Sequence, residues 1–249
     1  MLIAGRSASA VDMKLTAKSY VQNGLMAMWD GIENVGWGRH SNSTTTWVDL
    51  AGNGYDATQL LETGWHWGED CYVGDLQNGH AFMVPLSFSQ ALHELVNSHT
   101  IEYVFRPFAS ARMVPFGQYS GGLDVECTGV RYARWYYNGS PNIDTQNAWN
   151  WFDVDKCRRL TASAVSSSSD IKTYVCCNSR MTGAAAVSGS IGGAVPFRLG
   201  GEPARANMSI VGELCNVRVY GRPLAAAELE RNNTVDNRRF RTLENGSVA

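Results

Sequence analysis

Aromatic side chains are the residues of this sequence whose types and spacing best suit ligand recognition. The chain has 249 residues and eight tryptophans. Four of the tryptophans form two pairs, and one residue separates the members of each pair. On a strand, both indoles of such a pair would point to one face. Indole and phenol rings stack on sugar faces while their N–H and O–H groups donate hydrogen bonds. We take as candidate ligand-binding residues Trp65, Trp67, Trp149, Trp151 and Tyr136. The alternative is that these rings fill a core.

One pair of acids has a spacing that glycoside chemistry could use. Asp124 and Glu126 lie two residues apart and would share one face of a strand. Glycosidases use two carboxyl groups, one as acid and one as nucleophile or base. The alternative is an exposed, solvated pair. The sequence also holds no HExxH pattern and no GxSxG pattern. We therefore assign no catalytic residue and expect a chain that is not an enzyme.

Metal and cofactor binding are weakly indicated. Calcium prefers six to eight oxygen ligands, often from loop aspartates. Aspartates in loop-like contexts are Asp49, Asp56, Asp70, Asp75, Asp153 and Asp155, with no diagnostic spacing. The six cysteines form no CxxC pair, and we interpret them as free thiols used as small hydrophobes. No cofactor is expected, calcium remains an alternative, and the metal content is left open.

The elements that must position these residues are mostly short strands. The 25 glycines include several in Asn-Gly pairs, which favour the turns between antiparallel strands. Strands are expected at 101–105, at 160–165 and at 171–177, the last two flanking a turn at 166–170. Between residues 215 and 219 the alternation predicts that Cys215, Val217 and Val219 face a core. The next segment, 224–239, is the best helix candidate because Pro223 precedes it. This pattern predicts an all-β, two-sheet antiparallel sandwich with a short C-terminal helix.

Composition and charge narrow the classes of partner. The formal net charge is -2 and no run of Lys or Arg occurs, so no nucleic-acid partner is expected. No transmembrane stretch or signal peptide is seen, which predicts no membrane insertion and cytoplasmic synthesis. We divide the chain into an N-terminal arm, residues 1–20, and a single domain, residues 21–249.

Two stretches are similar to motifs of one family. The segment Trp47–Thr58 (WVDLAGNGYDAT) resembles a W-x-D-x-[SA]-G-N-x-x-[DN]-A motif, and Gly24–Asp30 precedes it as the opening strand. The segment Gly212–Leu224 with Glu228 resembles a closing G-x-[IL]-x-x-[IV]-R-[IV]-Y-x-R-x-L-[ST]-x-x-E motif. Both belong to concanavalin A-like, LamG-like jelly-roll domains. The tail 235–240 is similar to the C-terminal ends of family members from gut bacteria and their phages or prophages.

The resemblance implies a jelly roll and a function in recognition. It favours a non-catalytic, lectin-like module that binds a glycan or polysaccharide on a virion or cell-surface assembly. An alternative is a structural phage protein of a tail, fibre or decoration, with protein partners or a homo-oligomer and incorporation into a virion. A second alternative is a glycoside hydrolase with a degenerate acid motif. Related glucanases carry E-x-D-x-x-E, of which Asp124 and Glu126 would be a remnant.

Overall fold

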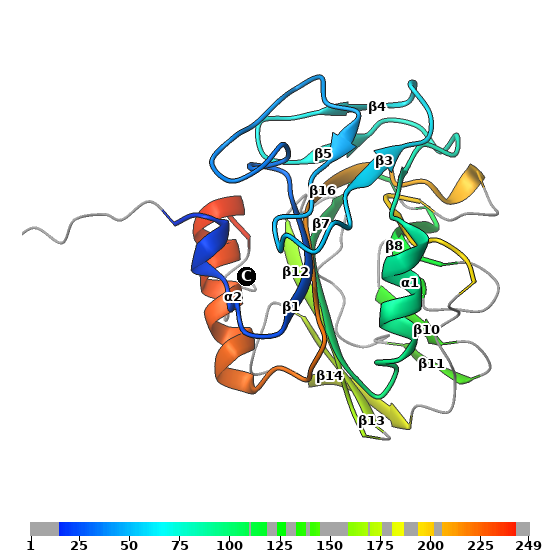
Figure 1. The fold of residues 1–249 in the computed structure, drawn as a ribbon. Coiled ribbons are helices and arrows are strands. Elements are labelled where there is room, and N and C mark those ends of the chain that lie inside the picture. The colour runs from blue at the N-terminus through cyan, green and yellow to red at the C-terminus, as the bar shows by residue number, and fades with distance from the viewer. Residues whose placement is uncertain are drawn as a thin grey trace, which may run out of the picture.

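The fold is seen in a computed structural model of the chain (Figure 1). It describes residues 15–109, 111–118, 124–127, 133–137, 140–144, 159–168, 170–175, 181–186, 194–201 and 206–242. In the strands at 124–144 and at 181–186 it describes the backbone alone.

Two antiparallel sheets form the described part of the chain. The first sheet has the order β14 (Met181–Ala186), β13 (Asp170–Val175), β12 (Leu160–Ser167), β7 (Ser98–Pro107), β16 (Gly212–Tyr220), β5 (Tyr72–Gly74) and β4 (Trp65–Trp67), and β1 (Leu25–Asp30) also pairs with β16. The second sheet has the order β11 (Ser140–Asp144), β10 (Ala133–Tyr137), β9 (Asp124–Cys127), β8 (Met113–Gly117), β15 (Arg198–Leu199), β6 (Phe82–Met83), β3 (Ala57–Gln59) and β2 (Thr46–Trp47). The helical elements are η1 (Ala17–Ser19), α1 (Leu86–His93), η3 (Ala206–Met208) and α2 (Ala226–Phe240). The predicted all-β sandwich with a C-terminal helix is confirmed.

The main core lies between the two sheets. In β7, Ile101, Tyr103 and Phe105 alternate toward it, and Phe82 and Phe116 come from the second sheet. Period-2 alternation also puts Val217 and Val219 of β16 into this core, as the sequence predicts. 

The expected inward position of Cys215 is wrong. The pairing of β16 with β7 contains a bulge between Leu214 and Asn216. The bulge adds one residue, which changes the face on which the following side chains lie. Leu214 therefore faces the core, while Cys215 packs with Val104 and Phe240 on the outer face of the first sheet.

The segment around Asp49 is a tight turn, and its carboxylate organises it. Oδ1 accepts hydrogen bonds from the backbone N–H groups of Met28 (3.0 Å) and Ala51 (2.9 Å), and Oδ2 from that of Asn53 (3.1 Å). Gly54 has φ +80°, a conformation that glycine adopts without strain. Burial raises the pKa of Asp49, and the backbone donors oppose that shift. Asp49 thus closes a turn.

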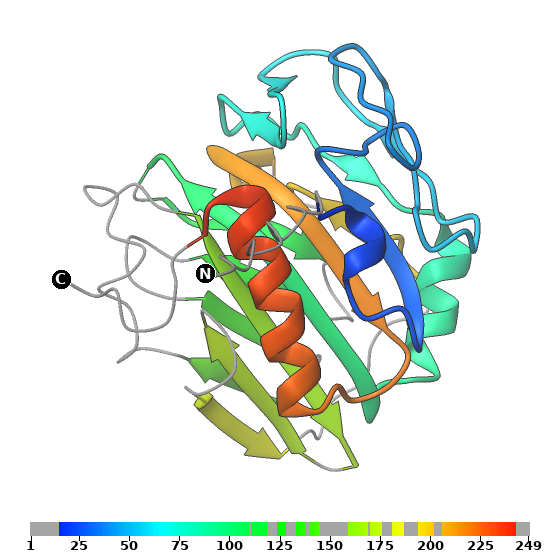
Figure 2. The same cartoon turned by 90° about the vertical axis from the view of Figure 1, so that its left-hand side faces the viewer.

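Helix α2 covers the outer face of the first sheet, as Figures 1 and 2 show. It begins at Ala226, and its N-cap is Ala225, whose side chain cannot accept a capping hydrogen bond. Glu228 compensates in part, because its Oε2 accepts from the Ala225 N–H at 2.9 Å. Arg222 donates to both oxygens of Glu228, at 2.8 and 2.5 Å. These hydrogen bonds, as the main cause, lower the pKa of Glu228 to about 2.

A buried polar network joins α2 to the sheet. The side chains of Arg218 and Asp236 are 0% exposed, and Arg218 donates to Asp236 at 2.6 and 2.8 Å and to Glu102 at 3.2 Å. Asn232 donates to Glu102 at 2.5 Å, and Thr161 donates to Asp236 at 2.9 Å. Burial raises the pKa of Glu102, and Arg218 opposes that shift. Residues on the outer face of β16 are therefore buried beneath a helix.

The N-terminal segment 15–20 belongs to the same assembly. Tyr20 is fully buried and donates to Asp236 at 2.7 Å. The Ala17 N–H donates to Glu33, which accepts from Arg239 at 3.0 Å. Residues 15–20 therefore pack against the rest of the domain, and the division of the chain at residue 20 stays a prediction. Residues 1–14 lie outside the described residues, and the arm remains a prediction there.

His99 makes stability depend on pH. It is fully buried at the start of β7, and burial lowers its pKa from 6.5 to about 4. The unfolded chain then binds a proton at higher pH than the folded chain. The stability that the neutral ring contributes is present above about pH 6.5 and is lost as the pH falls toward 4.

We expect the free energy of unfolding of the wild type to lose up to about 3 kcal/mol from this group between pH 7 and 4. His99→Gln removes the titration, so urea titrations at several pH values should show a flatter acid limb for the variant. Parallel acid limbs in the two proteins would contradict this assignment.

No helix among the described residues is long and apolar enough to span a membrane.

Candidate functional site

A groove crosses the outer face of the first sheet where α2 ends. Its floor contains a row of outward-facing residues on four neighbouring strands. The strand registers pair Arg106 of β7 with Glu213 of β16, Glu213 with Val73 of β5, and Val73 with His66 of β4. The turn before β5 forms one wall, and residues 237–242 form the other. The groove has a volume of about 1130 Å³, slightly larger than the roughly 300–1,000 Å³ of most small-molecule sites.

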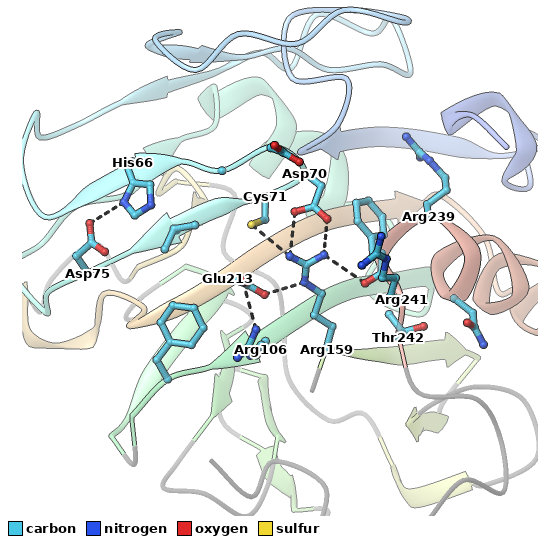
Figure 3. A pocket seen from close by; sticks show the side chains of 16 residues that line it. His66, Asp70, Cys71, Asp75, Arg106, Arg159, Glu213, Arg239, Arg241 and Thr242 are labelled. Carbon is cyan, nitrogen blue, oxygen red and sulfur yellow. Dashed lines mark hydrogen bonds and ion pairs between the residues drawn. The ribbon is translucent and has the colours of Figure 1, made fainter. Parts of the chain in front are cut away.

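Arg159 holds the centre of the groove together (Figure 3). Its side chain is 16% exposed. Its guanidinium donates to both carboxylate oxygens of Asp70, one of them at 2.9 Å, and to Glu213 at 2.7 Å. It also donates to the carbonyl oxygen of Phe240 at 3.2 Å. One planar cation thus links the turn before β5, the strand β16 and the end of α2.

Charges in the groove are balanced. Its lining contains four arginines, Arg106, Arg159, Arg239 and Arg241, and four acids, Glu69, Asp70, Asp75 and Glu213. Beyond the contacts of Arg159, His66 contacts Asp75 at 2.9 Å and Arg106 pairs with Glu213 at 3.6 Å. Arg239 pairs with Asp30 and Glu33, which do not line the groove, at 2.6 and 3.0 Å. The groove therefore offers hydrogen-bond donors and acceptors side by side.

One aromatic ring is exposed at this site. Phe108 is 39% exposed and lines the groove. The guanidinium of Arg106 lies over its ring, 5.1 Å from the centroid. The guanidinium covers one face of the ring, and the exposed part of the ring suits an apolar ring face in a ligand.

Of the two described tryptophan candidates, Trp67 lies in the core and Trp65 packs against it. They lie on β4, as expected, and both rings point the same way, but inward. Trp67 is 5% exposed, and its indole lies 5.0 Å from Trp47 and 5.6 Å from Phe82. Trp65 is half-buried, lies 5.4 Å from Phe82, and donates to the carbonyl oxygen of Leu61 at 2.6 Å. This packing argues against a stacking role for Trp67.

Other candidates are only partly covered. Trp149 and Trp151 lie outside the described residues, and Tyr136 lies on β10, whose backbone alone is described. Asp124 and Glu126 lie on β9, where their partners in register are Tyr136 and Arg134. Among the calcium candidates, Asp56 accepts from the Asp49 N–H at 2.8 Å, and Asp153 and Asp155 lie outside the described residues.

Sequence reasoning missed the groove. Arg159, Arg106 and Glu213 come from separate segments, and each resembles an ordinary solvated charge. The strand register places Glu213 opposite Arg106, and the alternation in β16 does not signal this, because the bulge after Leu214 changes the face of Glu213 relative to Val217.

Comparisons with protein-family models and with curated proteins give no match. Solved structures with the same fold do match. Domain 4 of AbnA, a GH43 extracellular arabinanase from Geobacillus stearothermophilus, in complex with arabinotriose, has a TM-score of 0.56 at 15% identity, over 82% of this chain and 96% of that one. The binding domain of Paraclostridial Mosquitocidal Protein 1 has a TM-score of 0.60 at 13% identity, over 87% and 52%.

A mutant of Trypanosoma rangeli sialidase displaying trans-sialidase activity has a TM-score of 0.60 at 14% identity, over 90% of this chain and 34% of that one. The chain therefore spans about a third of the sialidase length. At these identities the likeness establishes a shared β-sandwich fold.

Proposed function

We propose that this chain is a non-catalytic carbohydrate-binding module whose groove binds a neutral oligosaccharide. The observation that carries the proposal is the balanced set of charged, hydrogen-bonding side chains around Arg159. A sugar hydroxyl both donates and accepts, so it suits a surface where carboxylates and guanidiniums alternate. An anionic ligand would instead favour an excess of cations.

Phe108 supplies the apolar part of such a site. The C–H face of a sugar ring is apolar, and the exposed Phe108 ring offers a stacking surface next to polar groups. Domain 4 of the arabinanase, in complex with arabinotriose, is a fold relative of nearly the same length. We therefore name arabinotriose as the first probe.

The pairing of the acids supports binding without hydrolysis. A glycosidase needs one carboxyl group that carries a proton to the leaving oxygen. Asp70, Asp75 and Glu213 each pair with an arginine or a histidine. These partners occupy carboxylate oxygens that a general acid would turn toward the leaving oxygen of a substrate. The setting in a virion or cell-surface assembly, or in a phage particle, rests on the family resemblance and is part of the proposal.

Replacing the exposed ring tests the site with little risk to the fold. Phe108→Ala should weaken arabinotriose binding by about five- to thirtyfold, the loss of one stacked ring. Trp37→Ala is the matched control, since Trp37 is a ring of nearly equal exposure, 38%, and does not line the groove. Isothermal titration calorimetry should show an affinity for the control within about twofold of the wild type.

The ligand panel contains arabinotriose, xylotriose, cellotriose and the acidic trigalacturonate. Binding of a neutral trisaccharide that is sensitive to Phe108→Ala supports the proposal. Binding of trigalacturonate alone, equal binding by wild type and Phe108→Ala, or no binding by any member would overturn it.

A further inference from the structure

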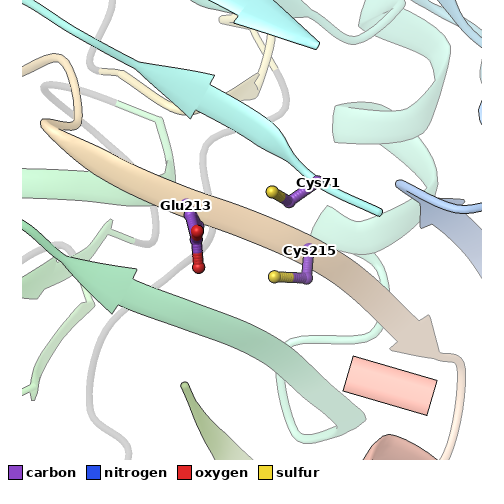
Figure 4. Close-up of side chains that lie close together, drawn as sticks. All are labelled: Cys71, Glu213 and Cys215. Atoms are coloured by element: carbon purple, nitrogen blue, oxygen red, sulfur yellow. The ribbon is translucent and has the colours of Figure 1, made fainter. Parts of the chain in front are cut away.

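Two cysteines meet beneath the groove, at the edge between β5 and β16. The register pairs Tyr72 with Leu214 on adjacent antiparallel strands. Cys71 comes directly before Tyr72 and Cys215 directly after Leu214, so the two cysteines lie next to each other. Figure 4 shows both side chains beside that of Glu213. The two sulfur atoms and a Glu213 oxygen all lie within 4.8 Å of one another.

The surroundings of the pair are apolar on one side and cationic on the other. Cys71 and Cys215 are buried at 2% and 0% exposure and pack with Phe240. Burial, as the main cause, raises the pKa of the Cys215 thiol well above its ordinary value. Arg159 lies against the pair, with Nη2 3.8 Å from Cys71 Sγ and Nε 2.7 Å from Glu213.

These contacts weigh against a metal ion. Zinc binds thiolates, and its sites usually have four ligands. Here Arg159 already holds Glu213, and its positive charge lies where a divalent cation would bind. A disulfide needs neither thiolates at rest nor a further ligand. It needs two Cα atoms about 4.4–6.8 Å apart, and directly opposed residues of antiparallel strands lie about 4.5–5.5 Å apart.

We propose that Cys71 and Cys215 are a site of reversible covalent modification, closing to an intramolecular disulfide with a small-molecule disulfide such as glutathione disulfide. Cys71 is the cysteine that lines the groove, and its sulfur attacks one glutathione sulfur and displaces the first glutathione. The Cys215 sulfur then attacks the Cys71 sulfur and displaces the second. Two protein thiols are oxidised, one glutathione disulfide is reduced, and the two thiol protons end on two glutathione molecules.

The cross-link would join two parts of the chain that are far apart in sequence. Residues 71 and 215 enclose more than half of the chain, and a disulfide across so long a loop restricts the unfolded state strongly. It would also fix the strand that carries Glu213 to the turn that carries Asp70. The proposal does not depend on which sugar the groove binds.

The test equilibrates the full-length wild type with glutathione disulfide, blocks free thiols, digests without reductant and maps the peptides by mass spectrometry. We expect a peptide containing Cys71 linked to one containing Cys215. We also expect a Tm higher than that of the reduced protein by on the order of 10 °C, reversed by dithiothreitol and absent in Cys71→Ser and Cys215→Ala.

Free alkylation of both thiols after equilibration would overturn the proposal, and so would glutathione adducts without the linked peptide. A third contradicting result is co-purified zinc that protects both thiols until a chelator removes it. The peptide map of the wild type decides the matter even where a variant fails to fold.

Discussion

Replacing Arg218 by methionine is expected to lower the free energy of unfolding by about 3–5 kcal/mol, because one partner of a buried ion pair is removed. Arg218 is the cation that Asp236 and Glu102 share, and all three side chains are at most 1% exposed. Methionine fills a similar space but leaves the carboxylates of Asp236 and Glu102 without their shared cation. Urea denaturation followed by circular dichroism measures the loss.

Arg238→Met is the matched control for that substitution. Arg238 is exposed on α2, the helix that carries Asp236, so its loss should change stability by no more than about 0.5 kcal/mol. Thr161→Val gives a milder version, removing one hydrogen bond to Asp236 at a cost of about 1–2 kcal/mol. A stability for Arg218→Met within 1 kcal/mol of the wild type would show that the network does not hold α2 to the sheet.

Replacing Arg159 by methionine is expected to weaken oligosaccharide binding by about thirtyfold or more. The substitution frees Asp70, Glu213 and the Phe240 carbonyl at once. Losing the charged hydrogen bonds that Arg159 organises should weaken the binding free energy by about 2–3 kcal/mol, which corresponds to this change in Kd. Calorimetric titration with the neutral trisaccharide that the wild type binds measures it.

Two comparisons separate loss of the site from loss of the fold. Arg159→Lys keeps the charge without the planar fork, so it should recover only part of the affinity. Arg231→Met removes an exposed arginine that bonds Ser19, away from the groove, and should bind like the wild type. An unchanged affinity in a folded Arg159→Met protein would remove Arg159 from the binding site.

The parts of the fold that follow local rules could be predicted from the sequence. Alternation places Val217 and Val219 in the core, and the hairpin of β12 and β13 forms around the serine-rich turn that was expected. The turn at Asp49 likewise follows from the residue types within it.

Features that depend on pairing between distant segments could not be predicted. The bulge at Cys215 reverses its face, and nothing in the local pattern signals it. Arg218 looks like a solvated residue on a strand until α2 is known to cover that face. The groove also depends on distant segments, because Arg159 contacts Asp70 and Glu213 only after β5, β16 and α2 have packed together. The pattern of Trp65 and Trp67 is ambiguous for another reason, because an aromatic pair on a strand can serve a core as well as a ligand site.

The most direct test of the central claim, that the groove binds a neutral oligosaccharide, is to map the backbone amide shifts of the isotope-labelled chain during titration with arabinotriose. The account predicts saturable shifts that cluster at residues 70, 71, 73, 106, 108, 159, 213, 241 and 242, all of which line the groove. Shifts that cluster on the second sheet, or spectra that do not change at millimolar sugar, would contradict it.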